Sequence, residues 1–253
     1  MITNCRFKIE DCRFKIFGIQ FPLAFFILLF HSSCGIAPKG EIASHEKEIT
    51  GNYSDTTKKR NPKLQDRFIG QIRSDVKTSF VNAIADTFES IKKLRNWLPS
   101  DEYMHKSTEA KHNNTPRTKE ENHNIYLYDL YIFGVKREDD NDYHVILGSS
   151  KSLDNGQAFL SAEISGLPDT SSIFFNQLYD LREKFMAYFG SEVTNEYVFV
   201  ASVKNPPIHL DYICGSLFFD NHHYGGHSKI ANYKVFTAWE IHPVTAIQFH
   251  QKR

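Results

Sequence analysis

The sequence predicts a mainly β fold of the α+β class: an OB-like five-stranded barrel with a helix between strands 3 and 4, preceded by a long amphipathic helix. From residue 125 onward, apolar and polar residues alternate with a period near two, and Phe and Tyr, which favour strands, are frequent. After the third of these alternating segments the spacing changes to that of a helix. An open sandwich with one covering helix is the alternative arrangement of the same elements.

The expected strands follow the alternation in chain order, at residues 125–136, 142–147, 158–165, 208–219 and 235–249, with a short additional strand at 197–203. The acidic residues 138–141 form a turn between the first two strands, and Asp154-Asn155-Gly156 is a turn signal before the third. Pro243 in the last strand indicates an edge position or a bulge, because proline cannot donate a hydrogen bond to a neighbouring strand.

The helix between strands 3 and 4 is expected to begin at Ser171 or Ser172, whose hydroxyl groups can cap its first turn. Gly190 is a typical helix end. The apolar residues that share one face of this helix are Ile173, Leu178, Leu181, Phe185 and Phe189. The barrel domain therefore extends from residue 125 to residue 253.

A second helical pattern precedes the barrel. Residues 66–99 carry apolar side chains at steps of three and four, which predicts one long amphipathic helix that Pro99 ends. We expect its apolar face to pack on its own domain, and partner binding is the alternative. Residues 100–124 are polar and are predicted to be a linker.

The N-terminal residues 1–34 have the order of an export signal: basic residues, an apolar run from Phe17 to Phe30, and small residues. The run is shorter than the ~20 apolar residues that a membrane-spanning helix needs. Ser32 and Ser33 directly before Cys34 resemble the lipobox of bacterial lipoproteins, which implies lipidation of Cys34. Ordinary signal cleavage and an uncleaved anchor are the alternatives. The polar residues 35–65 then form a tether. We expect an exported protein of the cell envelope, lipid-anchored to a bacterial membrane.

The charge balance and the absence of common catalytic motifs restrict the classes of function that the sequence can support. The 253 residues include 30 basic and 30 acidic side chains, so there is no net charge to attract nucleic acid, and a polymer or a protein is the expected partner. The sequence has no glycine-rich phosphate-binding loop, no G-x-S-x-G motif and no paired CxxC motif. With Cys34 lipidated, Cys214 is the one cysteine of the mature chain, so we expect no disulfide.

Three motifs of the barrel segment are specific enough to suggest a relationship. They are Asp142-Tyr143-His144, the segment from Gly215 to Asp220 followed by His222 and His223, and Glu240-Ile241-His242-Pro243-Val244. This set resembles a group of largely uncharacterised bacterial secreted proteins with D-Y-H, G-x-x-F-F-D-x-x-H and E-I-H-P-V motifs. The resemblance covers residues 125–249, and it implies an architecture and a set of positions but no activity.

Strand alternation puts potential ligands on common faces. His144 lies on one face of the second strand, Glu163 on one face of the third, and Glu240 and His242 share a face of the last. If these faces converge, the charged groups must be paired, hydrogen-bonded or bound to metal, because burying them alone is costly. One interpretation is a structural network of histidine–carboxylate hydrogen bonds. The other is a site for a divalent metal cofactor with histidine ligands that carboxylates orient.

The loop after the fourth barrel strand holds the densest set of potential ligands, namely Asp220, His222, His223 and His227. Gly225 and Gly226 interrupt this loop, so it has no helical histidine pair. Solvated histidines that bind metal weakly are the alternative interpretation.

Two functions remain. The first is a binding or structural module, in which Tyr126, Tyr128 and Tyr131 stack on a polymer ligand. The second is a metal-dependent hydrolase, such as a phosphodiesterase or nuclease. Its metal would be held by His144, Glu163, Asp220 and His242, and Glu240 would act as a catalytic base or orient a metal ligand. Only two arginines lie between residues 120 and 250, so few cationic groups are present to stabilise a phosphoryl group during hydrolysis. This scarcity favours the binding module over the hydrolase.

Overall fold

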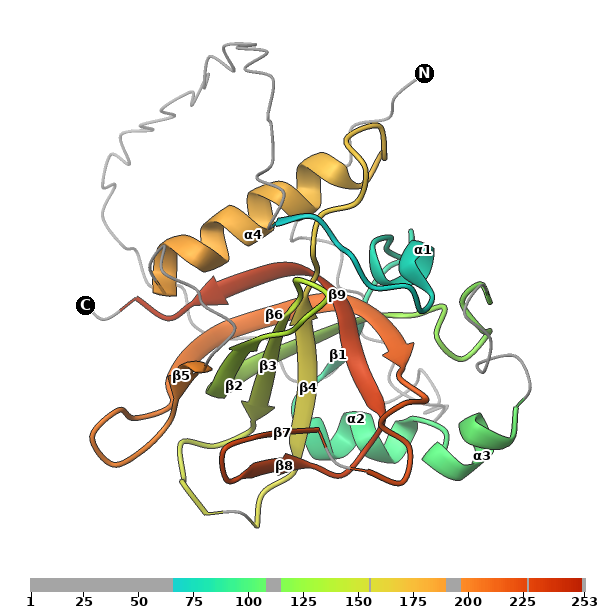
Figure 1. Ribbon diagram of the computed structural model, residues 1–253. Coiled ribbons are helices and arrows are strands. Elements are labelled where there is room, and N and C mark those ends of the chain that lie inside the picture. The colour runs from blue at the N-terminus through green and yellow to red at the C-terminus, as the bar shows by residue number, and fades with distance from the viewer. Residues whose placement is uncertain (1–65, 108–114, 155, 190–196, 227, 252–253) are drawn as a thin grey trace, which may run out of the picture. The chain divides into compact units, whose positions relative to one another are not determined.

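The structure is a computed structural model that describes residues 66–107, 115–154, 156–189, 197–226 and 228–251. The expected signal segment 1–34 with Cys34, the tether 35–65 and His227 lie outside the described residues. The predicted OB-like barrel is confirmed (Figure 1). Its strands are β2 (Asn124–Arg137), β3 (Tyr143–Gly148), β4 (Phe159–Ile164), β6 (Ile208–Phe219) and β9 (Trp239–Phe249).

The barrel closes in the order β2-β3-β4-β9-β6, and β6 pairs back onto β2. All of these pairs are antiparallel except β4 with β9, which is parallel. Helix α4 (Phe175–Phe189) connects β4 toward β6, so it lies between the third and fourth barrel strands as predicted.

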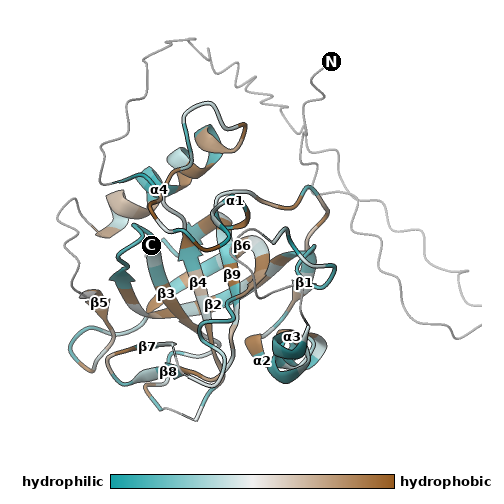
Figure 2. Ribbon diagram, turned by 45° about the vertical axis from the view of Figure 1, so that its right-hand side comes forward, coloured by the Kyte–Doolittle hydropathy of each residue, from teal (hydrophilic) through white to brown (hydrophobic). Residues whose placement is uncertain are grey.

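Helices close both ends of the barrel (Figure 1). At one end α4 inserts Leu181 and Phe185 into the core that fills the barrel, and apolar and polar residues alternate along this helix (Figure 2). At the other end α2 (Ile91–Trp97) contributes Ile91 and Leu94 to the same core. Inward-facing strand residues supply the rest of this core, which is dominated by Leu, Ile and Val.

Four short strands lie outside the barrel. The strand β1 (Asp86–Phe88) pairs with the start of β2, and β5 (Tyr197–Val200) pairs with its end. The hairpin of β7 (Ser228–Ile230) and β8 (Tyr233–Val235) forms within the β6–β9 connection. It packs on outward-facing apolar residues of the barrel, including Phe133, Ile146 and Phe159. The sequence prediction missed this hairpin and assigned its last residue to the final strand.

The long amphipathic helix expected over residues 66–99 is not formed. The segment contains α1 (Ser74–Lys77), β1 and α2, and Ser90 caps α2 by accepting a hydrogen bond from the amide of Lys93. Ile84 of the predicted apolar stripe is 96% exposed. Pairing of β1 with β2 and burial of α1 side chains against the barrel outweigh the local helical preference, which is a weak signal against tertiary contacts.

The segment predicted to be a polar linker, residues 100–124, also contains structure. Helix α3 (Asp101–Lys106) is capped by the preceding Ser100, whose side chain accepts a hydrogen bond from the amide of Tyr103. Asp101 in turn accepts hydrogen bonds from the Thr237 hydroxyl and the Ala238 amide. Residues 115–121 lie against the barrel, where the side chain of Glu121 is fully buried. Charged residues of this segment therefore form hydrogen bonds within the domain or are buried in it.

Candidate functional site

A group of titratable side chains meets on the outer face of the barrel, beneath the covering segments. This buried polar cluster consists of Lys77, Asp142, His144, Glu163, Asp220, Glu240 and His242. None of the seven is more than 9% exposed. Their neighbours Tyr143, Ala162 and Ile241 belong to the core inside the barrel, so strand alternation turns the polar residues outward. Strands β3, β4 and β9 therefore bring their polar faces together in one cluster.

His242 lies at the centre of the cluster, in a bulge of β9. Gly215 pairs with Val244 and Leu217 pairs with Ile241, so His242 and Pro243 together oppose a single residue of β6. The bulge expected from Pro243 is thus present, and bulges commonly redirect a side chain. The ring atom Nδ1 lies 2.7 Å from Glu163 Oε2.

Carboxylates surround the His242 ring. Besides Glu163, Glu240 Oε1 lies 3.2 Å from Nδ1, and Asp142 Oδ2 lies 3.2 Å from Nε2. Burial opposes a charge on this ring, but the negative charges of Glu163 and Asp142 outweigh it and hold the pKa of His242 well above its usual range. An imidazolium at His242 therefore balances part of the carboxylate charge of the cluster.

His144 is the second imidazole, and it shares Glu163 with His242. Its Nδ1 lies 3.0 Å from Glu163 Oε1, and its Nε2 lies 2.5 Å from the hydroxyl of Ser228 in β7. Burial lowers the pKa of His144, but the hydrogen bond to Glu163 raises it above its usual value. Glu163 itself has a pKa well below its usual range, because His242 and Lys77 outweigh the effect of burial.

The negative charges of Asp142 and Glu240, the other two carboxylates beside His242, are less well balanced by nearby positive charges. Burial raises the pKa of Asp142 to about 6 and that of Glu240 to about 7, and the charge of Glu163 adds to the increase at Glu240. Asp142 Oδ1 accepts a hydrogen bond from the Gly166 amide. Asp142 Oδ2, Glu240 Oε2 and His242 Nε2 have no hydrogen-bond partner in the described part of the chain.

Lys77 of α1 completes the cluster, and the sequence analysis did not identify it. Burial lowers its pKa, but the charges of Glu163, Glu240, Asp142 and Asp220 raise it above its usual range. The predicted long helix would have left this lysine solvated. No local pattern marks it, because its partners lie far away in the sequence and β-sheet pairing brings them together.

OB barrels usually bind ligands on the face of their second and third strands. The loop between strands 1 and 2 and the loop between strands 4 and 5 border that face. The cluster occupies this surface. In this chain those strands are β3 and β4, Asp142 follows the first loop, and Asp220 begins the second. Three covering segments contact it: Lys77 of α1 lies among its carboxylates, Arg117 donates a hydrogen bond to the carbonyl oxygen of His242, and Ser228 of the β7–β8 hairpin contacts His144. Cavities of about 510 and 380 Å³ exist elsewhere, and no cluster residue lines either.

The loop histidines differ in their relation to this cluster. The His223 side chain is 35% exposed, with Nδ1 3.7 Å from Asp220 Oδ2, and potential ligand atoms of His223, Asp220 and Glu240 lie within 4.8 Å of one another. The ring of His222 belongs to none of the potential ligand groups among the described residues. Of the predicted loop ligands, Asp220 and His223 are therefore placed at the edge of the cluster.

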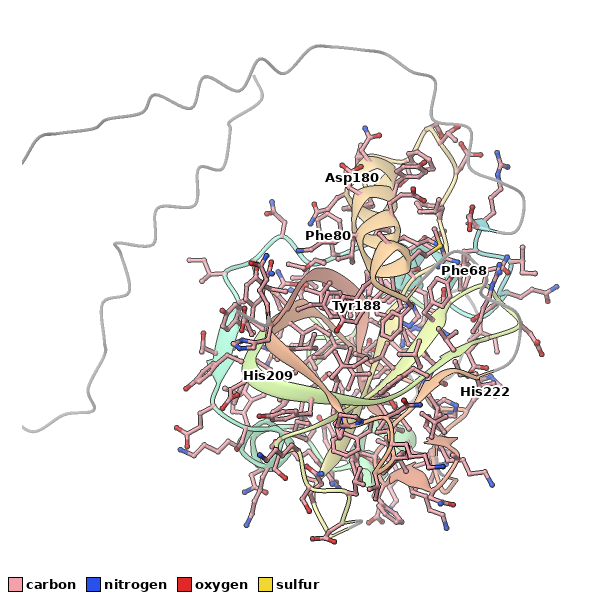
Figure 3. All side chains as sticks on the ribbon, turned by 90° about the vertical axis from the view of Figure 1, so that its left-hand side faces the viewer. Phe68, Phe80, Asp180, Tyr188, His209 and His222 are labelled. Carbon is pink, nitrogen blue, oxygen red and sulfur yellow. The ribbon has the colours of Figure 1, made fainter. Side chains whose placement is uncertain are left out.

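The predicted stacking residues lie on a different part of the barrel, which we call the tyrosine face. It consists of Tyr126, Tyr128, Tyr131, His209, Tyr212 and His250, with Asp129 and Asp211 between them. The ring centroids of Tyr126 and Tyr212 are 5.3 Å apart, and those of Tyr131 and His209 are 4.8 Å apart. Tyr128 is 41% exposed. His209 lies on one side of the barrel and His222 on the other (Figure 3).

Comparison of this chain with protein-family models, with curated protein sequences and with solved structures gives no match. Within the described residues, no helix combines the length and the apolar character needed to cross a membrane.

Proposed function

We propose that this protein is an exported binding module of the cell envelope that holds a neutral polysaccharide on the tyrosine face. One observation carries the proposal: partly exposed aromatic rings and exposed carboxylates gather on one side of a barrel whose usual ligand face is covered. Lipidation at Cys34 and the tether at residues 35–65 would position the domain at a membrane surface, near the polymers of the envelope.

The chemistry of the tyrosine face favours a neutral carbohydrate. Tyrosine rings offer apolar surface and a hydroxyl group at low entropic cost. Asp129 and Asp211 can accept hydrogen bonds from sugar hydroxyls; their exposed carboxylates pair with His209 and His250 at 2.7 and 2.6 Å. Residues 124–131 and 208–215 contain no lysine or arginine. A phosphate backbone would meet carboxylates without the cations that nucleic-acid binding requires.

Affinity electrophoresis of the full chain in gels that contain a soluble neutral glucan tests this proposal. We expect Tyr126→Ala and Tyr128→Ala each to weaken binding about tenfold, a loss of about 1.4 kcal/mol. Tyr103→Ala is the matched control, because Tyr103 is 57% exposed but lies on α3, away from the tyrosine face. Equal retardation of all variants, or stronger retardation by single-stranded DNA than by glucan, would rule out the proposed ligand.

Metal-dependent hydrolysis is the second candidate, and one observation favours it. The group of Asp220, His223 and Glu240 connects the buried polar cluster to solvent through the partly exposed His223. A metal at this edge could activate a water molecule. Hydrolysis of an activated phosphodiester that requires metal and is lost in His223→Ala but retained in His222→Ala would support this activity. No metal-dependent turnover in the wild-type protein would exclude it for that substrate.

A further inference from the structure

Two facing atoms of the buried polar cluster have no hydrogen bond that accounts for their burial. Asp142 Oδ2 and His242 Nε2 lie 3.2 Å apart as a buried ion pair, yet within the described residues neither atom has a partner with hydrogen-bond geometry. Both residues are completely buried. Leaving a buried polar atom unsatisfied costs about 1–3 kcal/mol, and more for a charged group. A cation bound by both atoms would satisfy each of them.

We propose that Asp142 Oδ2 and His242 Nε2 bind a divalent transition-metal cation such as Zn²⁺, with Glu163 as the carboxylate that orients His242. One potential ligand atom from each of these three residues lies within 4.8 Å of the others. Two ligands held ~2.1 Å from one cation are about 3.0–3.4 Å apart in octahedral or tetrahedral geometry. The 3.2 Å between Asp142 Oδ2 and His242 Nε2 agrees with that spacing.

The surroundings of the site fix the orientation of these ligands. Glu163 Oε2 lies 2.7 Å from His242 Nδ1, which directs the opposite ring nitrogen toward Asp142. A carboxylate on the second ring nitrogen is the usual companion of a metal-binding histidine. The Gly166 amide donates to Asp142 Oδ1 and leaves Oδ2 available. His144 holds the other oxygen of Glu163 at 3.0 Å.

The charge of the cluster also suits a cation. Four carboxylates surround one lysine and two imidazoles. Acidic side chains therefore outnumber basic ones in this buried place by four to three, and a bound cation would offset the excess. Carboxylate and imidazole ligands without a thiol suit zinc or manganese, whereas calcium and magnesium prefer oxygen ligands alone. The site would link the start of β3 with β4 and β9, so metal should stabilise the barrel.

Calorimetric titration of the full chain with Zn²⁺ tests the proposal. The protein is purified in detergent without a polyhistidine tag and freed of metal with a chelator. We expect one tightly bound Zn²⁺ per chain and an increase in Tm of about 5 °C. Asp142→Asn should weaken binding at least about 100-fold, because a neutral amide replaces a charged ligand.

Two control variants make the assignment specific. Glu240→Gln removes an equal charge from the same cluster but no ligand of this site, so its affinity should stay within about tenfold of wild type. His250→Ala removes an exposed histidine of the His250–Asp211 pair and should leave Zn²⁺ binding unchanged. Binding lost in Glu240→Gln but kept in Asp142→Asn would overturn the assignment, as would wild-type protein that binds no Zn²⁺ or binds it only through His250.

A spectroscopic measurement keeps the proposal testable if Asp142→Asn fails to fold. Co²⁺ added to the metal-free wild-type protein should give the intense visible absorption of a four- or five-coordinate ion with nitrogen ligation. The weak spectrum of hexaaqua Co²⁺ would contradict the site. Neither measurement uses a polysaccharide, so metal binding and the proposed function can fail separately.

Discussion

The guanidinium group of Arg73 forms two hydrogen bonds to the carboxylate of Glu121, at 2.7 and 2.6 Å, and both side chains are buried. Arg73 directly precedes α1, and Glu121 lies in the segment that precedes β2. Glu121 also accepts hydrogen bonds from the amides of Thr118 and Phe219. This ion pair therefore joins two segments that cover the barrel and fastens both to β6.

Removing the carboxylate of this pair should destabilise the protein and change its response to acid. Burial raises the pKa of Glu121, but the hydrogen bond and charge of Arg73 lower it below its usual value. A lowered folded-state pKa gives stability that is present above the unfolded-state pKa and is lost as pH falls through the folded-state value.

We expect Glu121→Gln to have an unfolding free energy about 3 kcal/mol lower than wild type at pH 7. As the pH falls from 5 to 3, the unfolding free energy of the variant should decrease less than that of wild type, because the variant lacks the carboxylate that becomes protonated. Urea unfolding at several pH values measures both effects. The exposed Glu89, which pairs with Lys93, provides the control variant Glu89→Gln. A Glu121→Gln protein as stable as Glu89→Gln at pH 7 would show that the pair contributes little.

Replacing the buried lysine tests the charge balance of the cluster. Lys77→Met should cost about 3–5 kcal/mol in the presence of chelator, because it leaves the surrounding carboxylates without their ammonium partner. Lys93→Met changes an exposed residue of α2 and should alter stability by less than about 0.5 kcal/mol. Chemical unfolding of both variants measures the difference, and equal stabilities would argue against an ionised Lys77.

The bulge beside His242 requires a glycine on the neighbouring strand. A Cβ atom at Gly215 would lie 2.5 Å from Ile241 Cγ2 and 2.5 Å from the Pro243 carbonyl oxygen. We expect Gly215→Ala to lower the unfolding free energy by about 1–3 kcal/mol. Gly156→Ala is the control, because no atom lies within 4 Å of a Cβ at that position. Thermal melting curves compare the two, and matching Tm values would contradict the close approach.

The proposed lipid anchor predicts a change in fractionation. Wild-type protein expressed in a bacterium should sediment with membranes and incorporate labelled palmitate, and Cys34→Ala should incorporate none. Cys214→Ala is the matched control and should behave as wild type. Incorporation that persists in Cys34→Ala would place the lipid on another residue, and no incorporation in the wild type would exclude lipidation.

Local patterns predicted the barrel, because strand alternation and turn residues are encoded over a few neighbouring positions. The same alternation brought His144, Glu163, Glu240 and His242 to one polar face. Lys77 could not be found in this way, since its partners are distant in the sequence. The helical spacing of residues 66–99 was misleading because β1 pairs with β2, a contact that no local pattern records.

Nuclear magnetic resonance of protein labelled at the tyrosine rings tests the central claim, saccharide binding by the tyrosine face, most directly. On addition of a soluble neutral glucan, the account predicts shifts in the ring signals of Tyr126, Tyr128 and Tyr212. It predicts no change for Tyr103 on α3 or for Tyr233 in β8. Unchanged signals from the tyrosine face at saturating glucan, or shifts confined to Tyr103 and Tyr233, would contradict it.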